Sequence, residues 1–210
     1  MIKAIIFDCD GVLVDSVGLA GEVLADYLRE LGFDVTRQEA TRRFGSGKMA
    51  EYVARFEREM GRRLPERFEH ELRSRREQVF RQRLRPVEGA GEFVRQLAIP
   101  SCVASNGPLA QIEHSLRVVG LHPLFDGRIF SAYSVRAWKP DPQLFLHASR
   151  ELGVAPAECA VVEDSELGIA AGVAAGMQVF AFLPGGGQTA HANVRTLRRL
   201  SELGEFLKPA

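Results

Sequence analysis

The feature that most constrains this chain is a short apolar segment near its start that ends in two aspartates. Residues 4–7 (Ala-Ile-Ile-Phe) are apolar without alternation, which is typical of a strand buried on both faces of a parallel sheet. Asp8 and Asp10 follow, and then Gly11, which allows the backbone to turn in a conformation that other residues disfavour. Because ligands of open α/β sheets gather at the carboxyl ends of strands, we expect both carboxylates to face a site.

The Asp-x-Asp pair has several possible uses. Residues two apart in an extended segment point the same way, so Asp8 and Asp10 can reach one locus. Paired carboxylates can hold a hard divalent cation such as Mg²⁺, supply a nucleophile, or act as general acid and base. A solvated turn, in which Asp forms local hydrogen bonds, is compatible with the same pattern. The motif by itself leaves these alternatives open.

Composition excludes some classes of function. The 210 residues contain 27 Lys and Arg against 27 Asp and Glu, and this zero net charge disfavours nucleic-acid and membrane-surface partners. Cys9, Cys102 and Cys159 lie in or beside apolar runs, so we expect buried free thiols in a reducing compartment. No apolar run is long enough to span a bilayer, and no signal peptide is evident. We expect a cytoplasmic protein, either a monomer or a weak homodimer.

Two patterns of secondary structure divide the chain. Residues 15–84 contain only helical periodicity, including a capping-box pair at Thr36 and Glu39 and a long charged helix opened by Pro65. Residues 85–210 alternate strands and helices, which predicts a parallel sheet with helices on both faces. We therefore expect an α/β fold, with a Rossmann-like doubly wound core from residues 1–14 and 85–210. The helical block at 15–84 is inserted in it, either as a plain bundle or as a cap over the site.

Three predicted strands end in polar clusters. Ser105 and Asn106 follow the strand at 99–104, and Glu163 and Asp164 follow the strand at 159–162. In a parallel sheet these ends share one edge with Asp8 and Asp10. The pattern therefore predicts one site that combines four carboxylates, a hydroxyl and an amide.

These motifs and their order resemble the haloacid dehalogenase (HAD) superfamily of phosphohydrolases. Asp8-Cys-Asp-Gly-Val-Leu-Val-Asp-Ser matches its first motif, and Ser105 stands where its second motif has Ser or Thr. Lys139, in Trp-Lys-Pro-Asp-Pro, matches the third, and residues 161–165 (Val-Val-Glu-Asp-Ser), followed by Gly168, match the fourth. The resemblance covers essentially the whole chain.

The resemblance implies a phosphatase that works through an aspartyl phosphate. Asp8 is then the nucleophile, and Asp10 is the general acid and base. Ser105, the backbone N–H of Asn106 and Lys139 hold the phosphoryl oxygens. The implied Mg²⁺ ligands are Asp8, the backbone carbonyl of Asp10, Asp164, and Glu163 either directly or through water.

A small helical insertion after the first motif resembles the β-phosphoglucomutase-like subgroup, in which a cap loop carries specificity residues. The matching loop here is residues 44–48 (Phe-Gly-Ser-Gly-Lys), so Gly45 and Lys48 are candidate substrate-binding residues. Lys48 would meet a second anionic group of the substrate, or else it is an exposed residue at a helix start. The stretches Ser105–Pro108 and Trp138–Pro142 also resemble bacterial 6-phosphogluconate phosphatases, which implies a sugar or sugar-acid phosphate as substrate.

Three other functions fit the sequence less well. A phosphomutase of the subgroup has a His early in the first cap helix, and residues 17–20 (Val-Gly-Leu-Ala) contain none. A dehalogenase lacks the second aspartate of the first motif, which is present here as Asp10. A catalytically silent binding protein would have lost one of Asp8, Asp10, Lys139 or Asp164, and all four are present.

Overall fold

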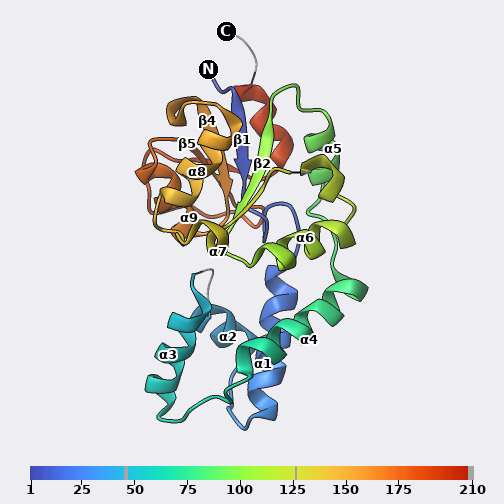
Figure 1. The fold of residues 1–210 in the computed structure, drawn as a ribbon, viewed down its shortest axis with the longest axis vertical. Helices are drawn as coiled ribbons and strands as arrows, with labels where there is room; N and C mark the ends of the chain where they lie inside the picture. The colour runs from blue at the N-terminus through green and yellow to red at the C-terminus, as the bar shows by residue number, and fades with distance from the viewer. Residues whose placement is uncertain (45–46, 126, 208–210) are drawn as a thin grey trace.

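The computed structural model describes residues 1–44, 47–125 and 127–207, which form two lobes (Figure 1). Over these residues the larger lobe contains a six-stranded sheet, ordered β3-β2-β1-β4-β5-β6, in which every pairing is parallel. The strands are β1 (Ala4–Phe7), β2 (Ser101–Ser105), β3 (Ile129–Ser131), β4 (Cys159–Glu163), β5 (Gln178–Phe182) and β6 (Arg195–Leu197). The predicted α/β fold class is confirmed.

Alternation along the strands builds one hydrophobic core on each face of the sheet. Ile5 and Phe7 of β1 face one core, while Ala4 and Ile6 face the other. The first core packs against α5 (Ala90–Arg95), α6 (Leu109–Val118) and η3 (Leu200–Phe206), and the second against α8 (Gln143–Leu152) and α9 (Glu166–Ala174). Three short elements complete this lobe: η1 (His122–Phe125), α7 (Ala132–Val135) and η2 (Pro156–Glu158). Because β1 is buried on both faces, the position of its carboxyl end within the lobe is fixed by the two cores.

The smaller lobe is helical and has an aromatic core of its own. It contains α1 (Val17–Glu30), α2 (Arg37–Arg43), α3 (Met49–Met60) and α4 (Phe68–Arg83). Phe44 lies 5.1 Å from Phe56 between ring centroids, and Tyr27 stacks on Phe68 at 5.2 Å. The capping box at Thr36 is formed as predicted. The predicted start of α4 at Pro65 is too early. Pro65 forms a turn in which its carbonyl accepts from the Phe68 amide, and the helix begins at Phe68.

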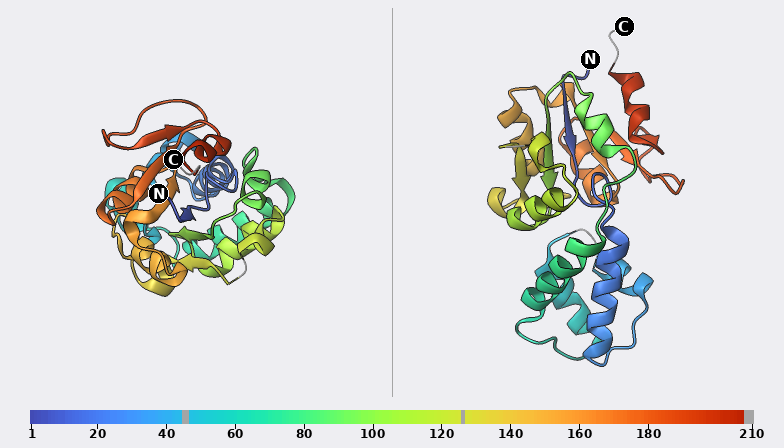
Figure 2. Two further views of the ribbon diagram at one scale, coloured as in Figure 1. Left: turned by 90° about the horizontal axis from the view of Figure 1, so that it is seen from above. Right: turned by 90° about the vertical axis from the view of Figure 1, so that its right-hand side faces the viewer.

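The chain crosses between the lobes twice, at a narrow waist (Figure 2). The two crossings are hydrogen bonded to each other: the Asp15 amide donates to the Arg85 carbonyl, and the Val87 amide donates to the Leu13 carbonyl, both at 2.9 Å. Phe80, near the end of α4, packs with the core of the sheet lobe. This pairing places the helical lobe over the carboxyl ends of the strands (Figure 1). The domain boundaries at residues 14/15 and 84/85 stay a prediction.

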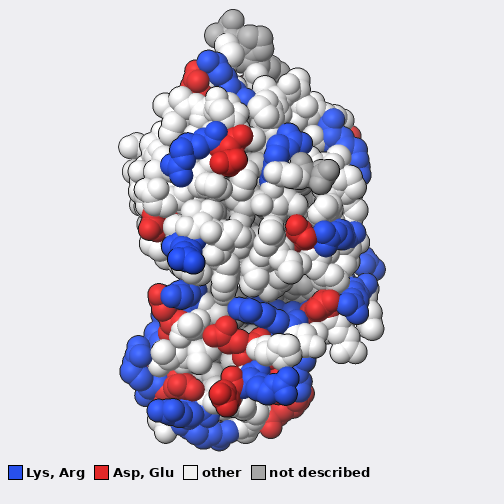
Figure 3. Space-filling view, viewed as in Figure 1, with Lys and Arg blue, Asp and Glu red and all other residues white. Residues whose placement is uncertain are grey.

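Surface charge is mixed in sign. In the view of Figure 3, basic and acidic side chains alternate, and they are denser over the helical lobe than over the sheet lobe. Among the described residues, no helix has the length and apolar character needed to cross a membrane.

Candidate active site

Three neighbouring strands end in polar side chains at the edge that faces the helical lobe. Asp8 follows β1, Ser105 ends β2 and Glu163 ends β4, and their exposed fractions are 7%, 2% and 1%. The strands pair in parallel and in register, so their carboxyl ends lie side by side. The cluster expected from the three strand ends is therefore brought together in space.

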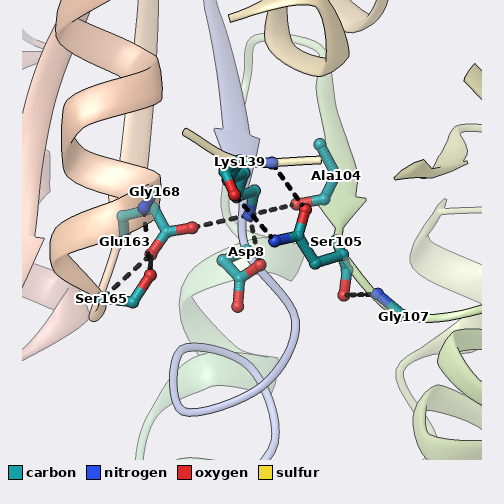
Figure 4. A network of polar contacts seen from close by, with 9 residues as sticks. Asp8, Ala104, Ser105, Gly107, Lys139, Glu163, Ser165 and Gly168 are labelled. Atoms are coloured by element: carbon teal, nitrogen blue, oxygen red, sulfur yellow. Dashed lines mark hydrogen bonds and ion pairs between the residues drawn. The ribbon is translucent and has the colours of Figure 1, made fainter. Parts of the chain in front are cut away.

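Lys139 lies at the centre of this cluster (Figure 4). Its ammonium donates to Asp8 Oδ1 at 2.5 Å, to Glu163 Oε1 at 2.6 Å and to the carbonyl of Ala104 at 2.8 Å. The residue is 3% exposed. One buried cation thus links the ends of β1, β2 and β4, and the second oxygen of Asp8 points away from it (Figure 4).

The segment that carries Lys139 is held by the end of β2. The Lys139 amide donates to Asn106 Oδ1 at 2.9 Å, and Asn106 Nδ2 donates back to the Lys139 carbonyl at 3.4 Å. Next to it, the Gly107 amide donates to Ser105 Oγ at 3.2 Å. The polar residues after β2 therefore position both the lysine and the turn that follows Ser105.

Glu163 is fixed by the start of α9. Its Oε2 accepts from the amide and the hydroxyl of Ser165, at 3.0 and 2.9 Å, while the same hydroxyl accepts from the Gly168 amide and caps the helix. A Cβ on Gly168 would lie 1.8 Å from Glu163 Oε1. Glycine is required at this position because the carboxylate occupies the space that any other side chain needs.

The loop after β1 carries Asp10 and contacts the fourth motif. Ser16 donates its hydroxyl to Asp10 Oδ1 at 2.5 Å, so the residue preceding α1 orients this carboxylate. Gly11 has φ +81°, and a Cβ there would lie 2.0 Å from Asp164 Oδ2. The loop needs glycine both for its turn and for this close approach.

Burial and crowding of like charges shift the acidities of the site. Burial first, and then the neighbouring carboxylates, raise the pKa of Asp8 to about 7 against the opposing effect of Lys139. Burial, Asp8 and Glu163 raise the pKa of Asp164 to about 8. Burial alone lowers the pKa of Lys139, but Asp8 and Glu163 outweigh it and the net shift is upward. Lys139 therefore stays charged, but its single positive charge does not balance the negative charges of Asp8, Glu163 and Asp164.

The carboxylates have the arrangement of a divalent-cation site. Asp8, Glu163 and Asp164 each offer an oxygen, and these oxygens lie within 4.8 Å of one another. Oxygen donors of this kind suit Mg²⁺, and the raised pKa values of Asp8 and Asp164 are those of a site that gains from a further cation. The Asp10 carboxylate is not one of the three, and its predicted carbonyl ligand stays a prediction.

A cavity of about 320 Å³ lies between the two lobes. It is lined by residues from the strand ends and from the helical lobe, and it includes all of the predicted core-site residues: Asp8, Asp10, Ser105, Asn106, Lys139, Glu163 and Asp164. Gly45 lies outside the described residues. Lys48 lies in the chain between Gly47 and Met49, which both line the cavity, and its ammonium is 4.9 Å from the ring centroid of Trp138.

Sequence reasoning missed several polar residues that line the cavity, among them Ser16, Ser165, Arg73 and Arg76. Ser16 and Ser165 each precede a helix, and a Ser at a helix start is a signal that a search for capping residues would have found. Arg73 and Arg76 of α4 also line the cavity. They belong to a helix in which arginine is frequent, and nothing in the sequence marks the face that turns inward.

Known proteins identify the family of this chain. The family model of haloacid dehalogenase-like hydrolases matches residues 2–176, and the chain therefore belongs to this family. It is 35% identical over 210 residues to 6-phosphogluconate phosphatase of Escherichia coli (strain K12), covering 99% of this chain and 95% of that protein. The expected enzyme class, a phosphatase, is confirmed by the family together with this full-length relative.

Two solved structures extend the comparison. A haloacid dehalogenase-like protein of unknown function from Agrobacterium tumefaciens aligns with a TM-score of 0.82 at 30% identity, over 99% of this chain and 98% of that one. CbbY of Rhodobacter sphaeroides, solved as a mutant in complex with xylulose-1,5-bisphosphate, aligns with a TM-score of 0.80 at 26% identity, over 97% of each chain. Both lobes of this chain thus have counterparts in known structures.

Proposed function

We propose that this enzyme is a Mg²⁺-dependent phosphatase that hydrolyses a small phosphorylated sugar or sugar acid through an aspartyl phosphate on Asp8. The observation that carries the proposal is the Lys139 ammonium between Asp8 and Glu163, at 2.5 and 2.6 Å. A buried cation in this place holds one oxygen of Asp8, while the other points away from the lysine (Figure 4). Asp8 lines the cavity, so this second oxygen can attack phosphorus there. The resemblance to 6-phosphogluconate phosphatase supports that compound as the first substrate to test.

In the proposed reaction, Asp8 attacks phosphorus in line and the bond to the leaving oxygen breaks. Asp10, oriented by Ser16, donates a proton to that oxygen. Water then attacks the phosphorus of the aspartyl phosphate, Asp10 takes the proton of the water, and inorganic phosphate leaves as Asp8 is restored. Lys139, Ser105 and the backbone N–H of Asn106 hold the remaining phosphoryl oxygens.

Asp8, Glu163, Asp164 and the carbonyl of Asp10 would hold Mg²⁺. When bound, the cation neutralises the repulsion between the Asp8 carboxylate and the phosphate dianion. The protein's own contribution is a rigid, water-poor wall in which these charges are already placed, because charge–charge interactions are stronger at low dielectric.

Phosphate release from a panel of phosphorylated metabolites, with Mg²⁺ and with EDTA, tests the proposal. The panel contains 6-phosphogluconate, hexose phosphates, phosphoglycolate and nucleotides. We expect Mg²⁺-dependent release that is fastest with a sugar or sugar-acid phosphate. Release from no compound would contradict the proposal and direct attention to the mutase alternative, for which interconversion of β-glucose 1-phosphate is the assay.

A further inference from the structure

The wall formed by the helical lobe contains a cation without a partner. Within the described part of the chain, the cavity is lined by the cations Lys139, Arg73 and Arg76. Lys139 is held by carboxylates, and Arg73 donates to Glu69 at 3.3 Å and to the Tyr133 hydroxyl at 3.1 Å. Arg76 has a buried Nε without a hydrogen-bond partner, and it forms no ion pair with a described carboxylate.

Arg76 is half-buried, and burial of its Nε without an acceptor has a free-energy cost. A buried charge is normally paired, since desolvation is not recovered otherwise. Burial accordingly lowers the pKa of Arg76, opposed by the Asp10 carboxylate, while Arg73 adds to the lowering. The charged groups that act on Arg76 are thus Asp10, whose carboxylate forms no ion pair with it, and Arg73, which is itself paired with Glu69.

Lys48, the cation expected from the sequence to contact a distal anion, is not among the residues that line the cavity, and its role in binding stays a prediction. Its ammonium lies 4.9 Å from the Trp138 ring centroid, and that ring meets Tyr133 edge-on at 5.2 Å. Lys48 thus makes a cation–π contact with Trp138 of the sheet lobe, an interaction that uses its charge. Arg76 is the better-placed cation for an anion inside the cavity.

We propose that Arg76 binds a carboxylate at the far end of the substrate and thereby selects sugar-acid phosphates over neutral sugar phosphates. This inference rests on the proposed phosphatase function. A guanidinium matches the two oxygens of a carboxylate in a planar fork. The single unpaired guanidinium of Arg76 balances the one negative charge of a carboxylate. A second phosphate group carries two negative charges, and the helical lobe offers no second unpaired cation among the described residues that line the cavity.

The test compares two acyclic six-carbon 6-phosphates that differ at carbon 1. 6-Phosphogluconate carries a carboxylate there, and sorbitol 6-phosphate carries a neutral hydroxymethyl group. We expect Arg76→Gln to lower kcat/KM for 6-phosphogluconate by about 10- to 100-fold, the range of a hydrogen bond to a charged group. For sorbitol 6-phosphate we expect a change within about threefold, because that substrate offers Arg76 no charge.

Three further variants complete the series. Arg81→Gln is the matched control, since Arg81 lies on the same helix, is exposed and pairs with Glu77. It should leave kcat/KM for both substrates unchanged. Arg76→Lys keeps the charge without the fork and should recover part of the selectivity. Lys48→Gln should leave the ratio of kcat/KM between the two substrates unchanged.

Several outcomes overturn the inference. Equal losses for both substrates in Arg76→Gln would mean that Arg76 acts on the phosphoryl group or on Asp10. Selectivity lost in Lys48→Gln and kept in Arg76→Gln would assign the role to Lys48. Wild-type preference for sorbitol 6-phosphate, or for fructose 1,6-bisphosphate over 6-phosphogluconate, would exclude the carboxylate. Each of these leaves the phosphatase function standing, whereas wild-type inactivity on every ester, including p-nitrophenyl phosphate, removes both proposals.

A measurement of stability separates ligand binding from a structural role. Because Arg76 is unpaired, Arg76→Met should leave Tm unchanged or raise it, as expected where stability is given up for binding. A lower Tm, together with equal loss of activity on both substrates, would show that the arginine supports the fold and would overturn the proposal.

Discussion

The two walls of the cavity differ in how their charged side chains are held. On the sheet wall, the Lys139 ammonium has three acceptors, and Glu163 is bonded by Lys139 and Ser165. On the helical wall, Arg76 Nε has no acceptor. The sheet wall is therefore organised before any ligand binds, as a catalytic wall must be, whereas the helical wall has donors that await a ligand. Substitutions on the sheet wall should therefore disturb catalysis and stability more than substitutions on the helical wall.

The largest effect is expected at Asp8. Asp8→Asn removes the nucleophile and should lower kcat by at least about 10⁴-fold, the scale of nucleophile removal in other hydrolases. The fold should persist, because Lys139 keeps its bonds to Glu163 and Ala104. Steady-state phosphate release and circular dichroism check both points. Activity within about tenfold of wild type would place the nucleophile elsewhere.

Lys139→Met tests whether the sheet wall depends on its central cation. The substitution leaves Asp8 and Glu163 buried without a counter-charge, so the free energy of unfolding at pH 8 should fall by about 3–5 kcal/mol. Turnover should be lost as well. Urea unfolding gives the measurement, and a decrease below about 1 kcal/mol, the value of a surface ion pair, would show that the network is not structural.

Mg²⁺ should stabilise the protein more at pH 8 than at pH 6. The pKa values of Asp8 and Asp164 are raised to about 7 and about 8, so the folded chain holds protons that the unfolded chain releases near pH 4. The contribution of these groups to stability therefore falls as pH rises from about 4 to 8, and bound Mg²⁺ removes the loss. At pH 8 we expect Tm to rise by about 5–10 °C with Mg²⁺ at roughly 100 times its Kd.

Thermal unfolding with Mg²⁺ and with EDTA at both pH values measures this dependence. Asp164→Asn is the matched variant, and it should lose most of the Mg²⁺-induced rise in Tm. An equal or larger rise at pH 6 than at pH 8 would contradict the assignment of these carboxylates to the metal.

Gly168→Ala tests the support behind the sheet wall. The new methyl group would overlap the Glu163 carboxylate, whose position is fixed by Lys139 and Ser165. We expect a loss of about 1–3 kcal/mol in stability and of about 10²-fold in kcat from displacement of the carboxylate. Gly204→Ala, where a Cβ meets nothing within 4 Å, is the control and should stay within about 0.5 kcal/mol. Similar behaviour of the two variants would contradict the packing argument.

The smallest effect is expected in the helical lobe, away from the cavity. Thr36→Ala removes the capping box of α2 and should lower stability by about 1 kcal/mol, with kcat/KM unchanged. A large loss of activity would mean that the helical lobe is coupled to the chemistry more tightly than the contrast between the walls implies.

The two walls also differ in how readily the sequence predicts them. A buried strand fixes the direction and place of the residue after it, so Asp8, Ser105 and Glu163 could be expected at one edge from topology alone. The cavity-facing side of α4 is set by how the helical lobe packs, and the helix contains charged residues around much of its circumference. Arg76 was therefore missed, while Lys48 was favoured because residues 44–48 match the cap loop that carries specificity residues in the β-phosphoglucomutase-like subgroup. The late start of α4 has a similar cause, since Pro65 suits a turn as well as a first helical turn.

The claim that Asp8 carries the phosphoryl group can be tested by trapping it. In Asp10→Asn, p-nitrophenyl phosphate needs no proton for its leaving group, so phosphoryl transfer proceeds while hydrolysis of the intermediate slows. Acid quenching during turnover, borohydride reduction of the acyl phosphate and peptide mass spectrometry locate the modified residue. If Asp8 carries the phosphoryl group, Asp8 is converted to homoserine, and this conversion depends on Mg²⁺ and is absent in the Asp8→Asn, Asp10→Asn double variant. Modification of another residue, or turnover in which Asp8 is never modified, would contradict that claim.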